Sequence, residues 1–396
     1  MAKPMQGVRI VDLSQLTSGP LATMMLAEQG ADVVKIEPPV IGDLFRLSSF
    51  LRNGFSALLL NHSHGKRSIV VDTSIAEGRE LVVELMTGAD VVVQNFRPGV
   101  VDRLGFGYDE IKAANPSVIY VSVSGFGPTG PYANRPVVDP IIQALTGIVA
   151  RQQSEAIPLP DLVRNIIVDK ATALTVAQAI SAALFHRERT GEGNHLVVPM
   201  LDAGLYFYWP DGMMDYTLVG DDVVPGPRIA DTYSLTQCAD GQVIYYAPTN
   251  EMRLRLYRVL GHPEFCEDDR FKDIAGLMQG DNLATLGAIL AQEFEKLPVA
   301  DVLERLVASE IPVAPILEPG EVLVDEQIVH NEAVVTWEHP KAGTVRQPRH
   351  PVRFSSADTP IPEFVPGLGE HTDEILAELG KTPEAIDSLR KLGAVV

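Results

Sequence analysis

Cysteine is almost absent from this chain of 396 residues, which contains only two, so no disulfide framework is expected. Positive charge is also scarce: 32 Lys and Arg stand against 52 Asp and Glu, giving a formal net charge of −20. A phosphate backbone requires a basic surface, so this balance argues against a nucleic-acid partner. No apolar run approaches the roughly 18 residues that span a membrane, and the N-terminal residues lack the apolar core of a signal peptide. Together these absences predict a cytoplasmic protein with no membrane partner.

The residues that are present predict an α/β fold. Hydrophobic residues make up 46% of the chain and charged residues 21%, as in an ordinary globular protein. Short runs rich in Val and Ile have the continuous apolar character of strands buried on both faces, and helical patterns separate them. Repeated strand–helix–strand units predict a parallel sheet with right-handed crossovers. The predicted strands are residues 8–13, 32–37, 68–71, 90–95 and 118–124, and the predicted helices are residues 20–29, 74–86 and 108–114.

The pattern changes after residue 202 and predicts a second domain. We expect a large Rossmann-like domain that begins with residues 1–202, an irregular linker over 203–234, and a smaller α+β domain over 235–312. A return linker and the C-terminal part of the large domain follow over 313–396. Ligands of parallel sheets bind beyond the carboxyl ends of the strands. The first candidate loops are therefore residues 14–19, 38–43, 72–74, 95–99 and 125–135.

Asp169 stands at the start of the longest predicted helix, residues 171–189, which is rich in Ala, Leu and Ile and closed by Gly191. An Asp at a helix start is most often an N-cap, because its side chain accepts hydrogen bonds from the first free N–H groups. A carboxylate at the positive end of a helix dipole can also attack an acyl group as a nucleophile. Position alone leaves both interpretations open and favours the cap.

Other motifs lack the context that their chemistry needs. Residues 125–130 match GxGxxG, but the surrounding prolines argue against the helix that a dinucleotide site requires. His62 and His64 have no further His or Cys at ligand spacing, so no metal site is expected. No Gly-x-Ser-x-Gly elbow is present to anchor a hydrolase triad. Cys238 and Cys266 show no pattern of a nucleophile and are expected to be packing residues.

Six stretches carry a resemblance to a known family. They are GVRIVDLSQLTSGPLATMMLAEQGADVVKIEPP (7–39), GKRSIVVD (65–72), ADVVVQNFRPGVVDRLGFGYDEI (89–111), NPSVIYVSVSGFGPTGPYA (115–133), RTGEGNHLVVPMLDA (189–203) and GEHTDE (369–374). In this order they resemble the family III CoA-transferases, the CaiB/BaiF group, which includes formyl-CoA transferase, carnitine CoA-transferase and the α-methylacyl-CoA racemases. The resemblance covers nearly the whole chain.

The resemblance implies a mechanism and a set of site residues. In that family the nucleophile is an aspartate just before the long helix, and counting back from residues 189–193 places it at Asp169. The implied reaction moves CoA from an acyl-CoA to a small carboxylic acid through aspartyl-anhydride and aspartyl-CoA intermediates. CoA is then a substrate, and no metal or tightly bound cofactor is expected. Gln15 is the candidate polar side chain that faces the acyl group, with a loop hydrogen bond as the alternative. The implied CoA contacts are Val71, Asp72, Thr73, Ser74, Asn95, Phe96, Arg97 and Arg103, with Asp139 near the pantetheine arm.

Departures from the family pattern narrow the implied function. Pro38 stands where formyl-CoA transferase has an arginine, and its glycine-rich loop has no counterpart in residues 221–234, which argues against oxalate–formate exchange. The racemases have a His immediately before the acid at position 139, where this chain has Val138. Racemisation must handle protons on both faces of the substrate, and His62 and His64 are expected in a distant loop, so Val138 favours transfer. A racemase and a non-catalytic CoA-binding protein remain alternatives. The resemblance further implies an interlocked homodimer.

Overall fold

The computed structural model describes residues 3–153, 159–355 and 364–396, and the chain divides into two compact units. The first unit joins Met1–Pro210 to His330–Val396, and the second comprises Asp211–Val329. Each unit has a hydrophobic core of its own. The predicted site residues all lie in the first unit.

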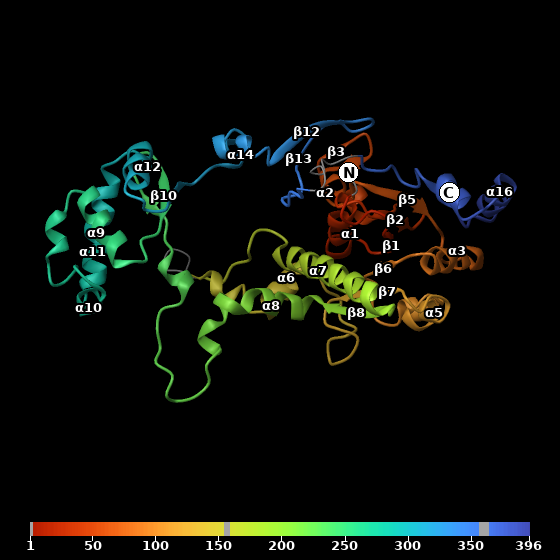
Figure 1. The fold of residues 1–396 in the computed structure, drawn as a ribbon, viewed down its shortest axis with the longest axis horizontal. Helices are drawn as coiled ribbons and strands as arrows, with labels where there is room; N and C mark the ends of the chain where they lie inside the picture. Colours follow the sequence, from red (N-terminus) through yellow and green to blue (C-terminus); the bar gives the residue numbers. More distant parts are fainter. Residues whose placement is uncertain (1–2, 154–158, 356–363) are drawn as a thin grey trace. The chain divides into compact units, whose positions relative to one another are not determined.

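A six-stranded parallel sheet forms the centre of the first unit (Figure 1). Its strands lie in the order β5-β2-β1-β6-β7-β8, so in chain order the sheet reads 3-2-1-4-5-6, the doubly wound order of Rossmann folds. The order reverses between β1 and β6, and the loops after these two strands flank the crevice where such sheets bind ligands. The strands are β1 (Arg9–Asp12), β2 (Asp32–Glu37), β5 (Lys66–Val70), β6 (Val91–Gln94), β7 (Ile119–Ser124) and β8 (Asn194–Pro199).

Helices cover both faces of this sheet, because side chains alternate between the faces along each strand. Val93 of β6 belongs to the buried cluster of one face, and its neighbour Val92 belongs to the cluster of the other. The first face packs against α1 (Ser18–Glu28), α6 (Asp139–Leu145) and α7 (Ile167–Thr190). The second face packs against α3 (Ala76–Thr87), α4 (Val100–Leu104), α5 (Tyr108–Ala114), α15 (Thr372–Glu378) and α16 (Pro383–Leu392). The sheet therefore lies between two helical layers.

The longest helix, α7, is long and apolar enough to cross a membrane by length and composition alone. Half of its most apolar window is buried inside the protein, however. Ala173, Val176 and Ile180 recur at helical spacing and are fully buried in the cluster shared with α1 and the sheet. This is the packing of a core helix in a globular unit.

A hairpin from the C-terminal segment packs beside α2 (Ala57–Ser63) in the same unit. Its strands are β12 (Val334–His339) and β13 (Gly343–Pro348), and the side chain of Gln347 donates a hydrogen bond to the carbonyl oxygen of Leu60 at 2.6 Å. A small apolar cluster fills the contact, with Leu59 from α2 and Val345 from β13. The remaining short elements of this unit are η1 (Leu44–Leu47), β3 (Leu51–Arg52), β4 (Phe55–Ser56) and η2 (Ala150–Gln152).

The second unit is a small α+β structure. A three-stranded antiparallel sheet in the order β11-β10-β9 packs with helices around buried aromatic and aliphatic side chains, among them Tyr257, Phe271 and Phe294. Its elements are η3 (Met214–Tyr216), η4 (Ile229–Thr232), β9 (Thr236–Gln237), β10 (Gln242–Tyr245), α9 (Asn250–Val259), η5 (Pro263–Cys266), α10 (Ile274–Leu277), α11 (Asn282–Glu295), α12 (Val299–Ala308), β11 (Val313–Pro315), α13 (Pro319–Val322) and α14 (Glu326–His330).

Several elements differ from those that the sequence predicts. Helix α8 (Met200–Gly212) occupies the first part of the predicted irregular linker. It contains Pro210 near its C-terminal end. Helix α7 begins at Ile167, so Asp169 lies within its first turn and is not the N-cap. Helices α2, α6 and α16 were not predicted, since each is short or interrupted by polar residues. The missing α6 matters most, because it carries Asp139.

Candidate active site

Asp169 lies in the first turn of α7 with its carboxylate directed at the start of α1. The Ser18 hydroxyl donates a hydrogen bond to Oδ1 of Asp169. The N-cap position of α7 is held by Ile166, which forms no side-chain cap bond. Burial raises the pKa of Asp169 to about 6, an effect that hydrogen bonding from Ser18 opposes and the negative charge of Asp139 reinforces. At neutral pH the carboxylate is therefore ionised and is not used to cap its helix.

Asp139, the first residue of α6, caps α7 in its place. Its Oδ2 accepts the backbone N–H groups of Val168 at 2.8 Å and of Asp169 at 2.9 Å. Its Oδ1 accepts a hydrogen bond from Nε2 of Gln143 at 2.6 Å. The Asp139 side chain is only 2% exposed. The carboxylate that the resemblance associates with the pantetheine arm is thus engaged in the protein interior, against the start of α7.

The loop after β1 carries Gln15 across the crevice between β1 and β6. Its backbone N–H donates to Oδ1 of Asn95 at 2.9 Å, and Nδ2 of Asn95 donates to the Gln15 carbonyl oxygen at 2.8 Å. Leu16 adopts φ 66°, a conformation that costs a non-glycine residue about 1–3 kcal/mol. Oδ1 of Asp43 accepts its N–H at 3.2 Å. The side chain of Asn95 therefore holds the backbone of this loop, and the Gln15 side chain is free of that contact.

Charged side chains buried beside this loop anchor it. Lys35 is 1% exposed, and its Nζ donates to the Ser14 carbonyl oxygen at 2.8 Å and pairs with Asp43 at 2.9 Å. Lys66 is fully buried, pairs with Asp12 at 3.0 Å and donates to a carbonyl oxygen of the first turn of α1 at 2.8 Å. Although burial alone raises the pKa of Asp12, the two ammonium groups hold it well below its usual range. The loop and the start of α1 thus have fixed positions.

A close backbone approach completes this geometry at Gly19, the second residue of α1. A Cβ atom at this position would collide with the Ser14 side chain, so only glycine fits. The approach lets the loop turn directly into α1 and places Ser18 against Asp169. The helices α1 and α7 therefore both begin beside the same carboxylate, where their partial positive charges add.

The other predicted CoA contacts lie at the same edge of the sheet. Phe96 and Arg97 line a pocket of about 270 Å³ at the carboxyl ends of β6 and β7, beside His195 and Val197 of β8, and Arg103 follows on α4. The side chains of Arg97 and Arg103 are exposed. After β5 come Val71, which is buried, Asp72, Thr73 and the exposed Ser74. The structure thus joins Gln15 to Asn95 by hydrogen bonds.

Comparison with known proteins identifies the family. The model of CoA-transferase family III matches residues 5–372. The chain belongs to CoA-transferase family III.

It is 32% identical to a formyl-CoA:oxalate CoA-transferase of Streptomyces coelicolor, over the whole of both chains. It is 31% identical to a succinyl-CoA:glutarate CoA-transferase of Mus musculus, over 99% of this chain and 90% of that relative. The chain also resembles a solved CaiB/BaiF family protein of Brucella suis, with a TM-score of 0.82 and 32% sequence identity. The match covers 96% of this chain and the whole of that one. The protein is a CoA-transferase enzyme, as the sequence resemblance predicted.

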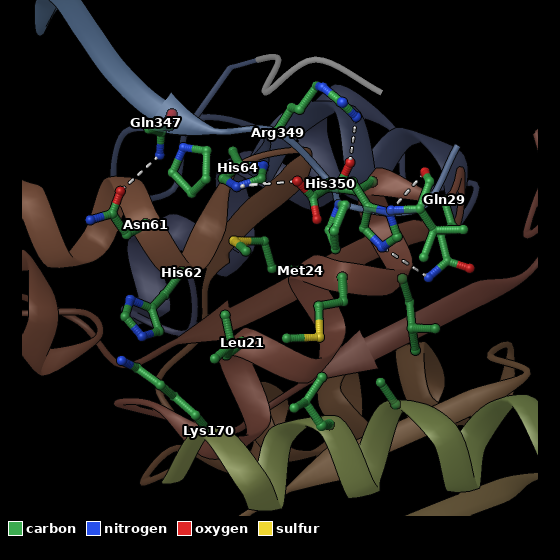
Figure 2. Close-up of a pocket in the computed structure, with 18 of the residues that line it drawn as sticks. Leu21, Met24, Gln29, Asn61, His62, His64, Lys170, Gln347, Arg349 and His350 are labelled. Carbon is green, nitrogen blue, oxygen red and sulfur yellow. Dashed lines mark hydrogen bonds and ion pairs between the residues drawn. The ribbon is translucent and has the colours of Figure 1, made fainter. Parts of the chain in front are cut away.

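In this CoA-transferase, α7 also borders a cavity of about 1400 Å³ with a mostly apolar lining (Figure 2). The expectation that His62 and His64 lie in a distant loop is wrong. His62 is on α2, His64 follows its end, and both line the cavity together with Lys170, the residue after Asp169. The carbonyl oxygen of Leu58 is 2.7 Å from Nδ1 of His62, and burial lowers the pKa of this ring to about 4. His62 is therefore a neutral imidazole at pH 7.

Ser18 and Gln143 were not among the predicted site residues, yet they form hydrogen bonds with the carboxylates of Asp169 and Asp139. A signal for Ser18 exists, because it ends the loop between the first buried strand and the helix that follows, and loops at this edge of such sheets bind ligands. For Gln143 the only sequence signal is its spacing of four residues from Asp139. This spacing indicates contact between the two side chains only once both are known to lie on one helix, α6. Across the described ranges, no group of three or more His, Cys, Asp or Glu side chains is arranged to hold a metal ion.

Proposed function

We propose that this enzyme transfers CoA from an acyl-CoA thioester to a small carboxylic acid, with Asp169 as the covalent nucleophile. The observation that carries the proposal is the Asp169 carboxylate in the first turn of α7, hydrogen-bonded by Ser18 and relieved of capping by Asp139. A carboxylate must be ionised to act as a nucleophile, and this one is ionised at neutral pH and does not cap its helix.

The proposed CoA transfer has four steps. Asp169 attacks the thioester carbonyl, the C–S bond breaks, and CoA leaves as a thiolate from a mixed anhydride on the enzyme. The thiolate attacks the aspartyl carbonyl and releases the donor acid as a carboxylate, leaving an aspartyl-CoA thioester. The acceptor carboxylate attacks that thioester and forms a second anhydride with release of thiolate. The thiolate then attacks the acceptor acyl carbonyl, which yields the new acyl-CoA and restores the Asp169 carboxylate.

Charge develops on oxygen in every tetrahedral intermediate of this sequence. Two helices begin beside Asp169, so the positive ends of their dipoles and the N–H groups of the first turn of α1 favour an oxyanion there. The fixed loop from Ser14 to Ser18 supplies these groups without reorganisation during the reaction. Gln15 projects from this loop and is the proposed polar contact of the acyl group.

For CoA itself we propose binding along the strand-end loops. The exposed guanidinium groups of Arg97 and Arg103 supply charge for its phosphates. Residues 71–74 (Val71, Asp72, Thr73 and Ser74) and Phe96 line the same edge of the sheet. Asn95 contributes by fixing Gln15.

The relatives named for oxalate and for glutarate support a small carboxylate as the acceptor. We also propose an interlocked homodimer in the cytoplasm, as the family resemblance implies. Large apolar side chains on α8 support an interface, since Tyr206 is 84% and Phe207 50% exposed. The free thiols of Cys238 and Cys266 agree with a reducing compartment.

A substrate panel tests the proposal. Acetyl-, formyl-, succinyl- and 2-methylacyl-CoA are each incubated with oxalate, formate, succinate and glutarate, and the CoA esters are identified by mass spectrometry. Transfer requires both a donor and an acceptor, so new CoA esters are expected only where an acid is added. Turnover without any acid, or no turnover across the panel, would contradict CoA transfer.

A racemase is the alternative function that the position of His62 supports. Its neutral imidazole, which could accept a proton, lines the cavity beside α7. Racemisation needs one group to remove the α-proton and another to return it on the opposite face. Val138 cannot carry a proton, and it is 55% exposed at the start of α6. We therefore predict negligible α-deuterium incorporation when 2-methylacyl-CoA is incubated with the enzyme in D₂O without acceptor acid. Rapid exchange that is lost in His62→Ala would favour the racemase.

A further inference from the structure

We propose that Asp139 and Gln143 form a clamp on α6 that sets both the position and the ionisation of the Asp169 carboxylate. The inference rests on the proposed function of Asp169 and gives Asp139 a positioning role in place of a contact with CoA. The two side chains lie four residues apart on α6, and each is 2% exposed.

Gln143 joins the clamp to the segment that leads into α7. Its Nε2 donates to Oδ1 of Asp139 at 2.6 Å and to the carbonyl oxygen of Asn165 at 3.0 Å. Its Oε1 accepts the N–H of Val163 at 3.0 Å. Both ends of the amide are therefore used, and a buried amide with satisfied donors and acceptor holds its neighbours in one arrangement.

Asp139 connects the clamp to the backbone of α7. Its second oxygen accepts the N–H groups of Val168 and Asp169, which are two of the free donors at the start of α7. The backbone that bears the nucleophile is thus tied to α6 by charge-assisted hydrogen bonds. Pro140 at the start of α6 fixes the chain direction immediately after Asp139.

The clamp also brings a negative charge close to the nucleophile. The groups that act on the Asp169 carboxylate are the Ser18 hydroxyl from α1 and the Asp139 carboxylate from α6, while Lys170 and His62 face the adjoining cavity. A neighbouring carboxylate disfavours ionisation of Asp169 and makes its oxygen a stronger nucleophile once ionised. A direct role of Asp139 at the pantetheine arm predicts instead that its loss weakens CoA binding.

The test measures the ionisation of Asp169 without substrate. Thermal midpoints of Asp169→Asn and of its parent are compared from pH 4 to pH 8, and the pH above which their difference stops growing reports the titration of Asp169 in the folded protein. The comparison is made in the wild-type background and in Asp139→Asn, Gln143→Leu and the control Glu80→Gln, whose side chain is exposed on α3. Turnover is measured with the best pair from the substrate panel, and CoA affinity by calorimetry.

The clamp predicts different results for its two members. In Asp139→Asn the titration of Asp169 moves to lower pH by about half a unit or more, because a negative charge is lost. In Gln143→Leu the titration stays in place while kcat falls about 10- to 100-fold, because the charge remains and the geometry is released. CoA affinity is unchanged in both, and Glu80→Gln changes nothing.

An unmoved titration in Asp139→Asn, or an unchanged kcat in Gln143→Leu, overturns the clamp. Weakened CoA binding with a normal titration restores the pantetheine role of Asp139. If Asp139→Asn does not fold, Gln143→Leu decides the positional part and Asp139→Ser the electrostatic part, since a neutral hydroxyl can still accept an N–H of α7 while the charge is lost, and the titration must then move downward. Absence of turnover in the wild type would contradict the proposed function alone, because the thermal titration requires no substrate.

Discussion

The start of α7 and the loops that carry Arg97 and Arg103 belong to one unit and face the same chemistry, yet their side chains are held differently. At the start of α7, Asp139 and Gln143 are buried and fully hydrogen-bonded, and the Asp169 carboxylate is met by Ser18. Arg97 and Arg103 are exposed, and no ion pair engages either of them among the described residues. The proposed nucleophile is therefore held in position by the protein itself, whereas the proposed phosphate contacts would form only when CoA binds.

The difference follows from what each region must do. A covalent nucleophile must be held close to its reactive geometry, so its supporting hydrogen bonds are made within the protein. A phosphate contact needs reach and charge, which a flexible exposed guanidinium supplies. Variants in the two regions should accordingly affect different quantities: the rate for α7 and CoA affinity for the arginines.

The largest effect is expected at the nucleophile. Asp169→Ala should reduce turnover by at least about 1,000-fold, because no other group can form the acyl anhydride. CoA affinity should stay within about threefold, since the carboxylate does not contact the phosphates. Hydroxylamine added with acyl-CoA should convert Asp169 of the wild type to a hydroxamate that peptide mass spectrometry locates. Normal turnover in the variant would remove Asp169 from the mechanism.

A large effect on folding is expected at Lys35, which anchors the loop between the two regions. Lys35→Met leaves the buried carboxylate of Asp43 without its cation, which costs about 3–5 kcal/mol in the free energy of unfolding. The same substitution at Lys381, whose pair with Glu84 is exposed, should cost less than about 1 kcal/mol. Urea unfolding of both variants checks the contrast. Equal losses would mean that burial of the Lys35 pair does not matter.

Much of the fold was predictable because the central strands are continuous apolar runs. Residues 32–37 are Val- and Ile-rich and form β2 at the predicted bounds. The N-cap interpretation of Asp169 was wrong for a physical reason: the donors of α7 are satisfied by Asp139, which lies 30 residues earlier in the chain. Local sequence cannot reveal a cap that is supplied by another helix. Asn95 illustrates the same limit, since its strand-end position was predicted but its reciprocal bonds with the Gln15 backbone depend on the order of β1 and β6.

A smaller effect is expected at the phosphate contacts. Arg103→Ala should weaken CoA binding by about 1.5–3 kcal/mol, the usual worth of a charge-assisted contact, and more at low salt than at high salt. Turnover at saturating CoA should be nearly unchanged, because the nucleophile keeps its partners. Calorimetry at two ionic strengths measures the affinity, with Arg97→Ala as the parallel variant. Unchanged affinity in both variants would reject the placement of CoA along these loops.

The smallest effect is expected on the free energy of unfolding, which the buried charge of Asp169 lowers. Burial raises the folded-state pKa of Asp169 to about 6, so the folded protein binds more protons here than the unfolded chain between about pH 4 and pH 6. Stability is therefore lost as pH rises through this window, and the cost is complete above pH 6. Asp169→Asn removes the charge and should stabilise the protein by about 1–2 kcal/mol at pH 7.5, after allowance for partial exposure, but not at pH 4. Over the same window the kcat of the wild type should rise with pH as the carboxylate ionises. A variant that is no more stable than the wild type at pH 7.5 would show that Asp169 is held without strain, and the contrast between the two regions would then rest on geometry alone.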